Sequence, residues 1–116
     1  MKRLFLILVV VKTSLALAQE FDPDRLRTAD RLINNYQFTE ALSWLNHPED
    51  SIDVDILQRK GYCYFRTGNY GNAIRQYEKI IALDSTNRNA LFQLGQLYAR
   101  NAQYENAYAC YQKLIR

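Results

Sequence analysis

Histidine and cysteine are scarce in this chain, and their scarcity argues against most kinds of catalytic or metal site. The 116 residues include one histidine and two cysteines. The histidine, His47, stands before Pro48 and two acidic residues, a pattern typical of a solvated turn rather than of an acid–base centre. A zinc site needs about four nitrogen or sulfur ligands, which these residues do not supply. We therefore expect no catalytic residue, no metal and no cofactor.

An excess of positive charge is also missing once the N-terminal segment is set apart. The sequence has 15 basic and 12 acidic residues, and three of the basic ones, Lys2, Arg3 and Lys12, lie near the start. Without them the two kinds of charge balance. Proteins that bind nucleic acid usually present a basic stripe that neutralises phosphates, so nucleic-acid binding is not expected.

The chain has no apolar run of the roughly 20 residues that a membrane span needs. Its longest run, from Leu4 to Val11, is interrupted by Lys12 and follows a basic start. Small residues then precede Gln19, in the sequence Ala16-Leu17-Ala18. This pattern predicts a signal peptide over residues 1–18, cleaved after Ala18, and a periplasmic or secreted protein without a membrane span. The alternative is an uncleaved membrane anchor.

What the sequence does contain is a repeated pattern. Gly61 and Gly95 stand 34 residues apart, and the residues that follow them recur with the same displacement. The other shared positions are Tyr64 and Tyr98, Tyr70 and Tyr104, Ala73 and Ala107, and Tyr77 and Tyr111. A fainter copy lies upstream, where Ala29 replaces the glycine and Ala41 precedes Ala73 by 32 residues.

This pattern resembles the tetratricopeptide repeat, a helix-turn-helix unit of 34 residues. The sequence departs from the family at Lys60, where an apolar residue is usual, at Ser85 in place of proline, and at Ala102 in place of glycine. The resemblance implies an all-α fold, a right-handed superhelical array of antiparallel helix pairs. We expect one domain over residues 19–116, with repeats over about 22–53, 54–87 and 88–116. The last repeat is incomplete, which indicates a fragment of a longer array or a helix covered by a partner.

Small residues are expected where the two helices of a repeat approach most closely, at Gly61 with Ala73 and at Gly95 with Ala107. The repeated tyrosines should bury their rings beside them, with each hydroxyl reaching a polar partner or water. Gly68 suits the left-handed position that ends a helix. In the next repeat we expect Asn101 to take that position.

Capping residues support the same helix boundaries. Asp53 and Asn87 are good N-cap residues before the first helices of repeats two and three. Asp22, followed by Pro23, gives the same signal in repeat one. Pro48 is expected to end the second helix of that repeat near Asn46.

The two cysteines of an exported protein could form a disulfide. However, Cys63 falls on the first helix of repeat two and Cys110 on the second helix of repeat three, which are not immediate neighbours in such an array. A bridge needs Cα atoms within about 7 Å. We expect two unpaired residues that pack as small apolar side chains.

The resemblance also implies a function, the binding of a protein or peptide in a concave groove lined by the first helix of each repeat. The groove-facing positions are Asp55, Gln58, Tyr62, Phe65 and Arg66 in repeat two, and Asn89, Phe92, Gln96, Ala99 and Arg100 in repeat three. From these, the candidate partner-binding residues are Tyr62, Phe65, Arg66, Phe92, Gln96 and Arg100. The alternative is that ordinary packing occupies these rings.

Two functions remain open at this point. The chain is an exported adaptor with a peptide or protein partner, or it is a structural or dimerising segment of a longer repeat protein without its own ligand. Self-association through the C-terminal helix belongs to the second alternative. Neither is an enzyme.

Overall fold

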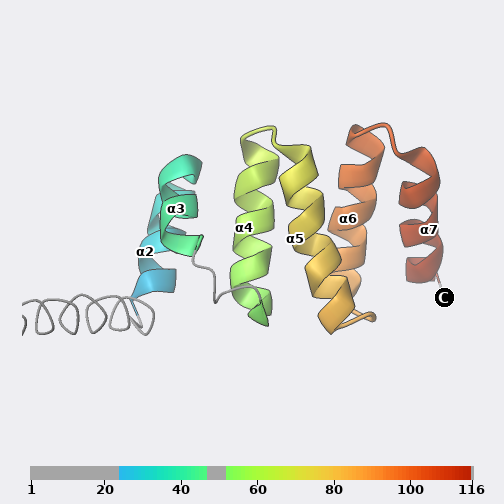
Figure 1. Ribbon diagram of the computed structural model, residues 1–116, viewed down its shortest axis with the longest axis horizontal. Coiled ribbons are helices and arrows are strands. Elements are labelled where there is room, and N and C mark those ends of the chain that lie inside the picture. Colours follow the sequence, from blue (N-terminus) through green and yellow to red (C-terminus); the bar gives the residue numbers. More distant parts are fainter. Residues whose placement is uncertain (1–23, 47–51, 116) are drawn as a thin grey trace, which may run out of the picture.

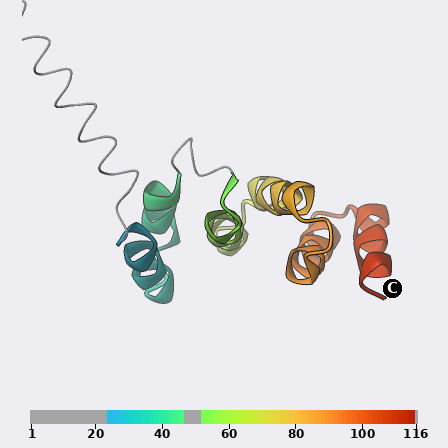
Figure 2. The same ribbon diagram turned by 90° about the horizontal axis from the view of Figure 1, so that it is seen from below.

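The computed structural model describes residues 24–46 and 52–115, and these form three antiparallel helix pairs. The pairs stand side by side in sequence order, and each helix packs mainly on the helices before and after it (Figure 1). Seen from below, α2, α4 and α6 lie along one side of the array, and α3 and α5 along the other (Figure 2). The predicted all-α repeat fold is confirmed. The helices are α2 (Arg25–Asn34), α3 (Phe38–Leu45), α4 (Val54–Arg66), α5 (Tyr70–Leu83), α6 (Arg88–Arg100) and α7 (Tyr104–Ile115).

The turn inside each helix pair has the same backbone geometry. Tyr36, Gly68 and Ala102 take left-handed conformations, with φ of 61°, 79° and 60°. After each of them an N–H donates back to the helix, as Asn69 does to the carbonyl of Tyr64 at 2.8 Å, which is the Schellman pattern. The prediction for Gly68 is confirmed.

The prediction for Asn101 is wrong, because Asn101 is the C-cap with φ of −90° and Ala102 takes the left-handed position. The two hydrogen bonds of the Schellman motif require a left-handed conformation at the residue directly after the C-cap, whatever its side chain. A non-glycine residue there costs roughly 1–2 kcal/mol, which the packing of the repeat offsets.

The predicted N-caps of repeats two and three are confirmed. Asp53 accepts hydrogen bonds from the N–H groups of Asp55 and Ile56, and Asn87 accepts one from Ala90. Helix α3 ends at Leu45, with Asn46 as its C-cap, where the following proline was expected to end it. The proposed cap of repeat one, Asp22 with Pro23, lies outside the described residues, and so do His47 and Pro48.

Each glycine of the repeated pattern makes room for a tyrosine ring of the second helix. A Cβ added at Gly61 would lie 2.5 Å from the ring of Tyr77, and one at Gly95 would lie 2.8 Å from the ring of Tyr111. The expected contact of Gly61 with Ala73 stays a prediction, and Ala73 is fully buried. The structure adds the Tyr77 ring, which supplies the atoms nearest to the glycine. Burial raises the pKa of Tyr77 to about 12.

Two apolar clusters form the core, one at each junction between repeats. The first joins repeats one and two and includes Leu45 and Cys63, and the second joins repeats two and three and includes Ile80, Leu97 and Cys110. As predicted, both cysteines are buried packing residues, and they are unpaired. Burial raises the pKa of the Cys63 thiol to about 11, which keeps it protonated and unreactive at neutral pH.

The repeated tyrosines of α4 and α6 each bond to the preceding repeat. The Tyr64 hydroxyl accepts a hydrogen bond from the Asn46 side chain at 3.2 Å. The Tyr98 hydroxyl donates to the Glu78 carboxylate at 3.1 Å. Asn46 and Glu78 occupy equivalent places in successive repeats, so the expected polar partners of these hydroxyls are found at matching positions.

Candidate functional site

A groove of about 460 Å³ crosses the first helices of all three repeats. It brings together side chains from α2, α4 and α6, with Tyr77 of α5 between them. The lining residues are Asp30, Ile33, Asp55, Gln58, Arg59, Tyr62, Phe65, Tyr77, Asn89 and Gln93. No single repeat builds this surface, because it exists only where the repeats are stacked.

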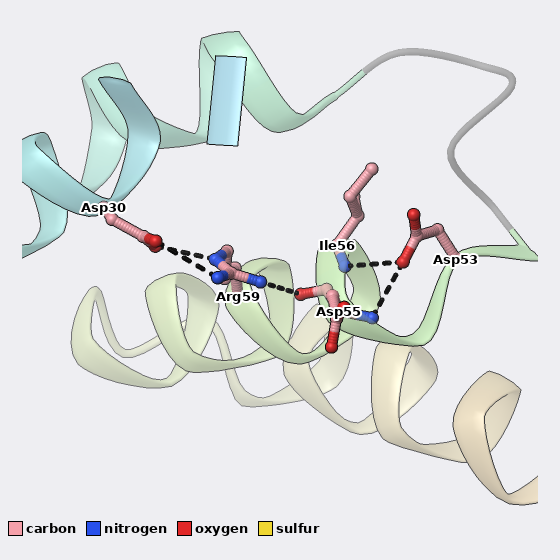
Figure 3. A network of polar contacts seen from close by, with 5 residues as sticks. All are labelled: Asp30, Asp53, Asp55, Ile56 and Arg59. Atoms are coloured by element: carbon pink, nitrogen blue, oxygen red, sulfur yellow. Dashed lines mark hydrogen bonds and ion pairs between the residues drawn. The ribbon is translucent and has the colours of Figure 1, made fainter. Parts of the chain in front are cut away.

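An ion pair in the groove joins α2 to α4 (Figure 3). The Arg59 guanidinium donates from Nε to one oxygen of Asp30 at 2.6 Å and from Nη2 to the other at 3.1 Å. Its third contact is a hydrogen bond from Nη1 to the main-chain carbonyl of Asp55 at 3.0 Å. The bond to Asp30 is the main cause that raises the pKa of Arg59, and the only basic group of the groove is thereby neutralised in place.

One carboxylate and three side-chain amides of the groove form no hydrogen bond to another described residue. The Asp55 carboxylate lies in the exposed first turn of α4, and neighbouring Asp53 is used as the N-cap. The side-chain amides of Gln58, Asn89 and Gln93 likewise make no hydrogen bond to the described residues. One carboxylate and three amides therefore face the groove ready to contact a bound molecule.

Arg66 is held against the aromatic residues at one edge of the groove. Its guanidinium lies 4.9 Å from the ring centroid of Phe38 and 5.7 Å from those of Tyr36 and Tyr62. It also donates a hydrogen bond to the Tyr62 hydroxyl at 2.8 Å. The rings of Phe38 and Tyr62 meet edge to face at 5.9 Å. The Tyr62 ring, which lines the groove, is thus oriented by residues of both repeat one and repeat two.

Phe65 has a similar environment in the next layer. The Arg100 guanidinium lies 4.9 Å from its ring centroid, and the ring of Tyr70 lies 6.1 Å away. Phe65 is half-buried and packs against the core cluster of Leu57 and Ile80. The ring therefore contributes to packing and lines the groove at the same time.

The structure separates the six candidate residues into three groups. Tyr62 and Phe65 line the groove, and Arg66 and Arg100 stack on those two rings. Phe92, 45% exposed, and Gln96 lie on the surface of α6 and are not part of the groove lining.

Two family models match this chain, one described as TPR repeat over residues 61–101 and one described as tetratricopeptide repeat over residues 89–116. Residues 61–116 are tetratricopeptide repeats. No curated protein matches it. Tetratricopeptide repeats generally mediate protein–protein interaction, and the family is typically not catalytic.

Within residues 24–46 and 52–115 there is no group of three side chains that could hold a metal ion. In the same residues no helix combines the length and the apolar character that crossing a bilayer requires.

Several residues of the site were not predicted from the sequence, among them Asp30, Arg59, Tyr36 and Phe38. The Arg59–Asp30 pair joins positions 29 residues apart, and neither position belongs to the repeated pattern. Phe38 could have been found, because it stands where the later repeats have Tyr70 and Tyr104. For Tyr36 the equivalent residues are Gly68 and Ala102, so the repeat gave no hint of a ring there.

Proposed function

We propose that this chain is an exported adaptor that binds an extended or helical segment of another exported protein in the groove of α2, α4 and α6. The family supports protein binding in general. The features of residues 1–18 that predict a cleaved signal peptide support a periplasmic or secreted location.

The groove is the observation that carries this proposal. It combines an aromatic wall, Tyr62 and Phe65, with polar groups that have no described partner. Both rings are held by stacked arginines before any partner arrives. Such preorganisation lowers the entropy lost on binding, and Tyr, Phe and Arg are residue types that often dominate interface energies.

The test is partner capture from the envelope or secreted fraction with variants of the groove. Tyr62→Ala should lower capture by a factor of about 30 or more, which is typical for an aromatic anchor, while helical circular dichroism is retained. Tyr104→Ala is a matched control, since Tyr104 is an exposed tyrosine on α7 outside the groove. Equal loss in both variants, or in neither, would argue against the groove.

Export is tested separately on the protein recovered outside the cytoplasm. N-terminal sequencing or intact mass should place Gln19 first. A recovered protein that still begins at Met1 would contradict cleavage, whatever the groove binds.

A second candidate function, self-association, is favoured by the exposed face of α7. Tyr108 and Ile115 are 64% and 84% exposed. Of the equivalent residues of α5, Ile74 belongs to the core cluster at the junction with α6 and Ile81 packs against it. Light scattering should then show a dimer that Tyr108→Glu dissociates. A monomer at all concentrations would remove this candidate and leave the groove proposal untouched.

A further inference from the structure

Within the proposed function, the charges of the groove point to the chemistry of the segment that it takes. Its three titratable groups other than tyrosine are Asp30, Asp55 and Arg59. Asp30 and Arg59 neutralise each other through two hydrogen bonds. Asp55 forms no ion pair among the described residues, but its charge and that of the Asp53 cap also act on Arg59. Three carboxylates therefore outnumber the one guanidinium at this end of the groove.

The aromatic wall lies farther along the same helix. Asp55 and Tyr62 both lie on α4 and both line the groove. Seven residues of helix correspond to about 10 Å, at 1.5 Å per residue. An extended segment covers that distance in about three residues, at roughly 3.3 Å per residue.

The side-chain amides suit the main chain of such a segment. Gln58 on α4 and Asn89 and Gln93 on α6 each offer a donor and an acceptor. The N–H and C=O groups of an extended chain present the same two functions in alternation. The groove thus has a separate place for a cation, for the main chain and for an apolar side chain.

We infer that the groove binds an extended segment in which a lysine or arginine, placed against Asp55, stands about three residues from an apolar or aromatic side chain, placed against Tyr62 and Phe65. This inference rests on the proposed function and commits it to a cationic segment. Salt weakens the charged contact and not the apolar one, because the Asp55 carboxylate is exposed.

The experiment uses labelled ten-residue peptides of glycine and serine that contain one phenylalanine and, three positions away, a lysine, a glutamine or a glutamate, in both orders. Fluorescence polarisation with the full chain should rank lysine first, about fivefold tighter than glutamine, and glutamate last. Asp55→Lys should reverse this order. Glu105→Lys should leave it unchanged, because Glu105 is also a first-turn acid, on α7, but does not line the groove.

The outcomes separate this inference from the proposal on which it rests. Equal binding of the three peptides, or an order unchanged in Asp55→Lys, would overturn the cationic segment. Failure of every peptide to bind, while partner capture still depends on Tyr62, would overturn it too and leave the adaptor proposal standing. If Tyr62→Ala also has no effect on capture, both are wrong.

Discussion

The two junctions between repeats join equivalent helices but differ in chemistry. At the junction of repeats two and three, Leu94 and Cys110 are buried in an apolar cluster. The equivalent residues at the junction of repeats one and two are Lys60 and Gln76, which are also buried, at 8% and 7% exposure. The Gln76 Oε1 atom has no hydrogen-bond partner among the described residues. The first junction is therefore stabilised less by apolar burial than the second.

Polar contacts replace part of that burial at the first junction. The Asp30–Arg59 pair joins α2 to α4, whereas the equivalent positions at the second junction are Tyr62 and Gln93, which form no ion pair. Each junction also has a stacked arginine, Arg66 on Phe38 and Arg100 on Phe65, both at 4.9 Å. Equivalent junctions of one repeat fold can thus be held by two kinds of side-chain contact, of which only the polar kind is sensitive to salt.

A lysine introduced at the second junction, at the position equivalent to Lys60, should have the largest effect on stability. Leu94→Lys places a charge in the cluster of Ile80 and Leu97 and should lower the free energy of unfolding by about 3 kcal/mol or more. Lys60→Leu should change it by less than about 1 kcal/mol. Urea denaturation measures both. Similar losses in the two variants would contradict the chemical difference between the junctions.

The glycines inside the repeats should show the next largest effect, and here the two repeats should agree. Gly61→Ala and Gly95→Ala each push a methyl group into a tyrosine ring and should cost about 2 kcal/mol. Gly71→Ala is the control, because nothing lies within 4 Å of its added Cβ and alanine favours a helix. That variant should be more stable by up to about 1 kcal/mol in the same denaturation series. A tolerated Gly61→Ala would mean that the Tyr77 ring moves away easily.

The ion pair at the first junction should have a smaller and salt-dependent effect. A double-mutant cycle of Asp30→Ala and Arg59→Ala should give a coupling of about 1 kcal/mol, since both side chains are partly exposed. The coupling should shrink in 1 M salt. Gln93→Ala, at the second junction, should be nearly neutral at either salt concentration. A coupling that does not respond to salt would show that packing rather than charge is measured.

The smallest effect concerns Tyr98, whose pKa is raised to about 12, first by burial and then by Glu78. Because the folded value lies above the ordinary value of about 10, stability from this group is full below pH 10 and is lost as the pH rises from 10 toward 12. Glu78→Gln should lower the pKa of Tyr98 in an ultraviolet titration and should barely change stability at pH 7. An unchanged titration curve would contradict the contact between the two side chains.

Much of the fold was predictable because its signals are local and periodic. The spacing of Gly61 and Gly95, the caps Asp53 and Asn87, and the left-handed Gly68 each act within one repeat, so the sequence alone indicated them. Ala102 escaped prediction because the turn's hydrogen bonds, not the residue's own preference, decide its conformation.

The site was predicted less completely, for a physical reason. Tyr62 and Phe65 were expected in the groove from their helical positions, and they line it. The partners that hold them come from other repeats or from positions where the repeats differ, as Phe38 does beside Arg66. The repeat spacing identifies positions that the copies share, and it does not show contacts between residues that differ from copy to copy.

The Asp30–Arg59 pair also bears on how such an array can change during evolution. If repeat two were deleted, or repeat three copied directly behind repeat one, Asp30 would face Gln93 and lose its guanidinium partner. If repeat two instead followed a repeat with tyrosine at the position of Asp30, Arg59 would lose its carboxylate partner as well. The repeats of this protein share the geometry of their turns but are not exchangeable, so the side chains at each junction specify their order along the chain.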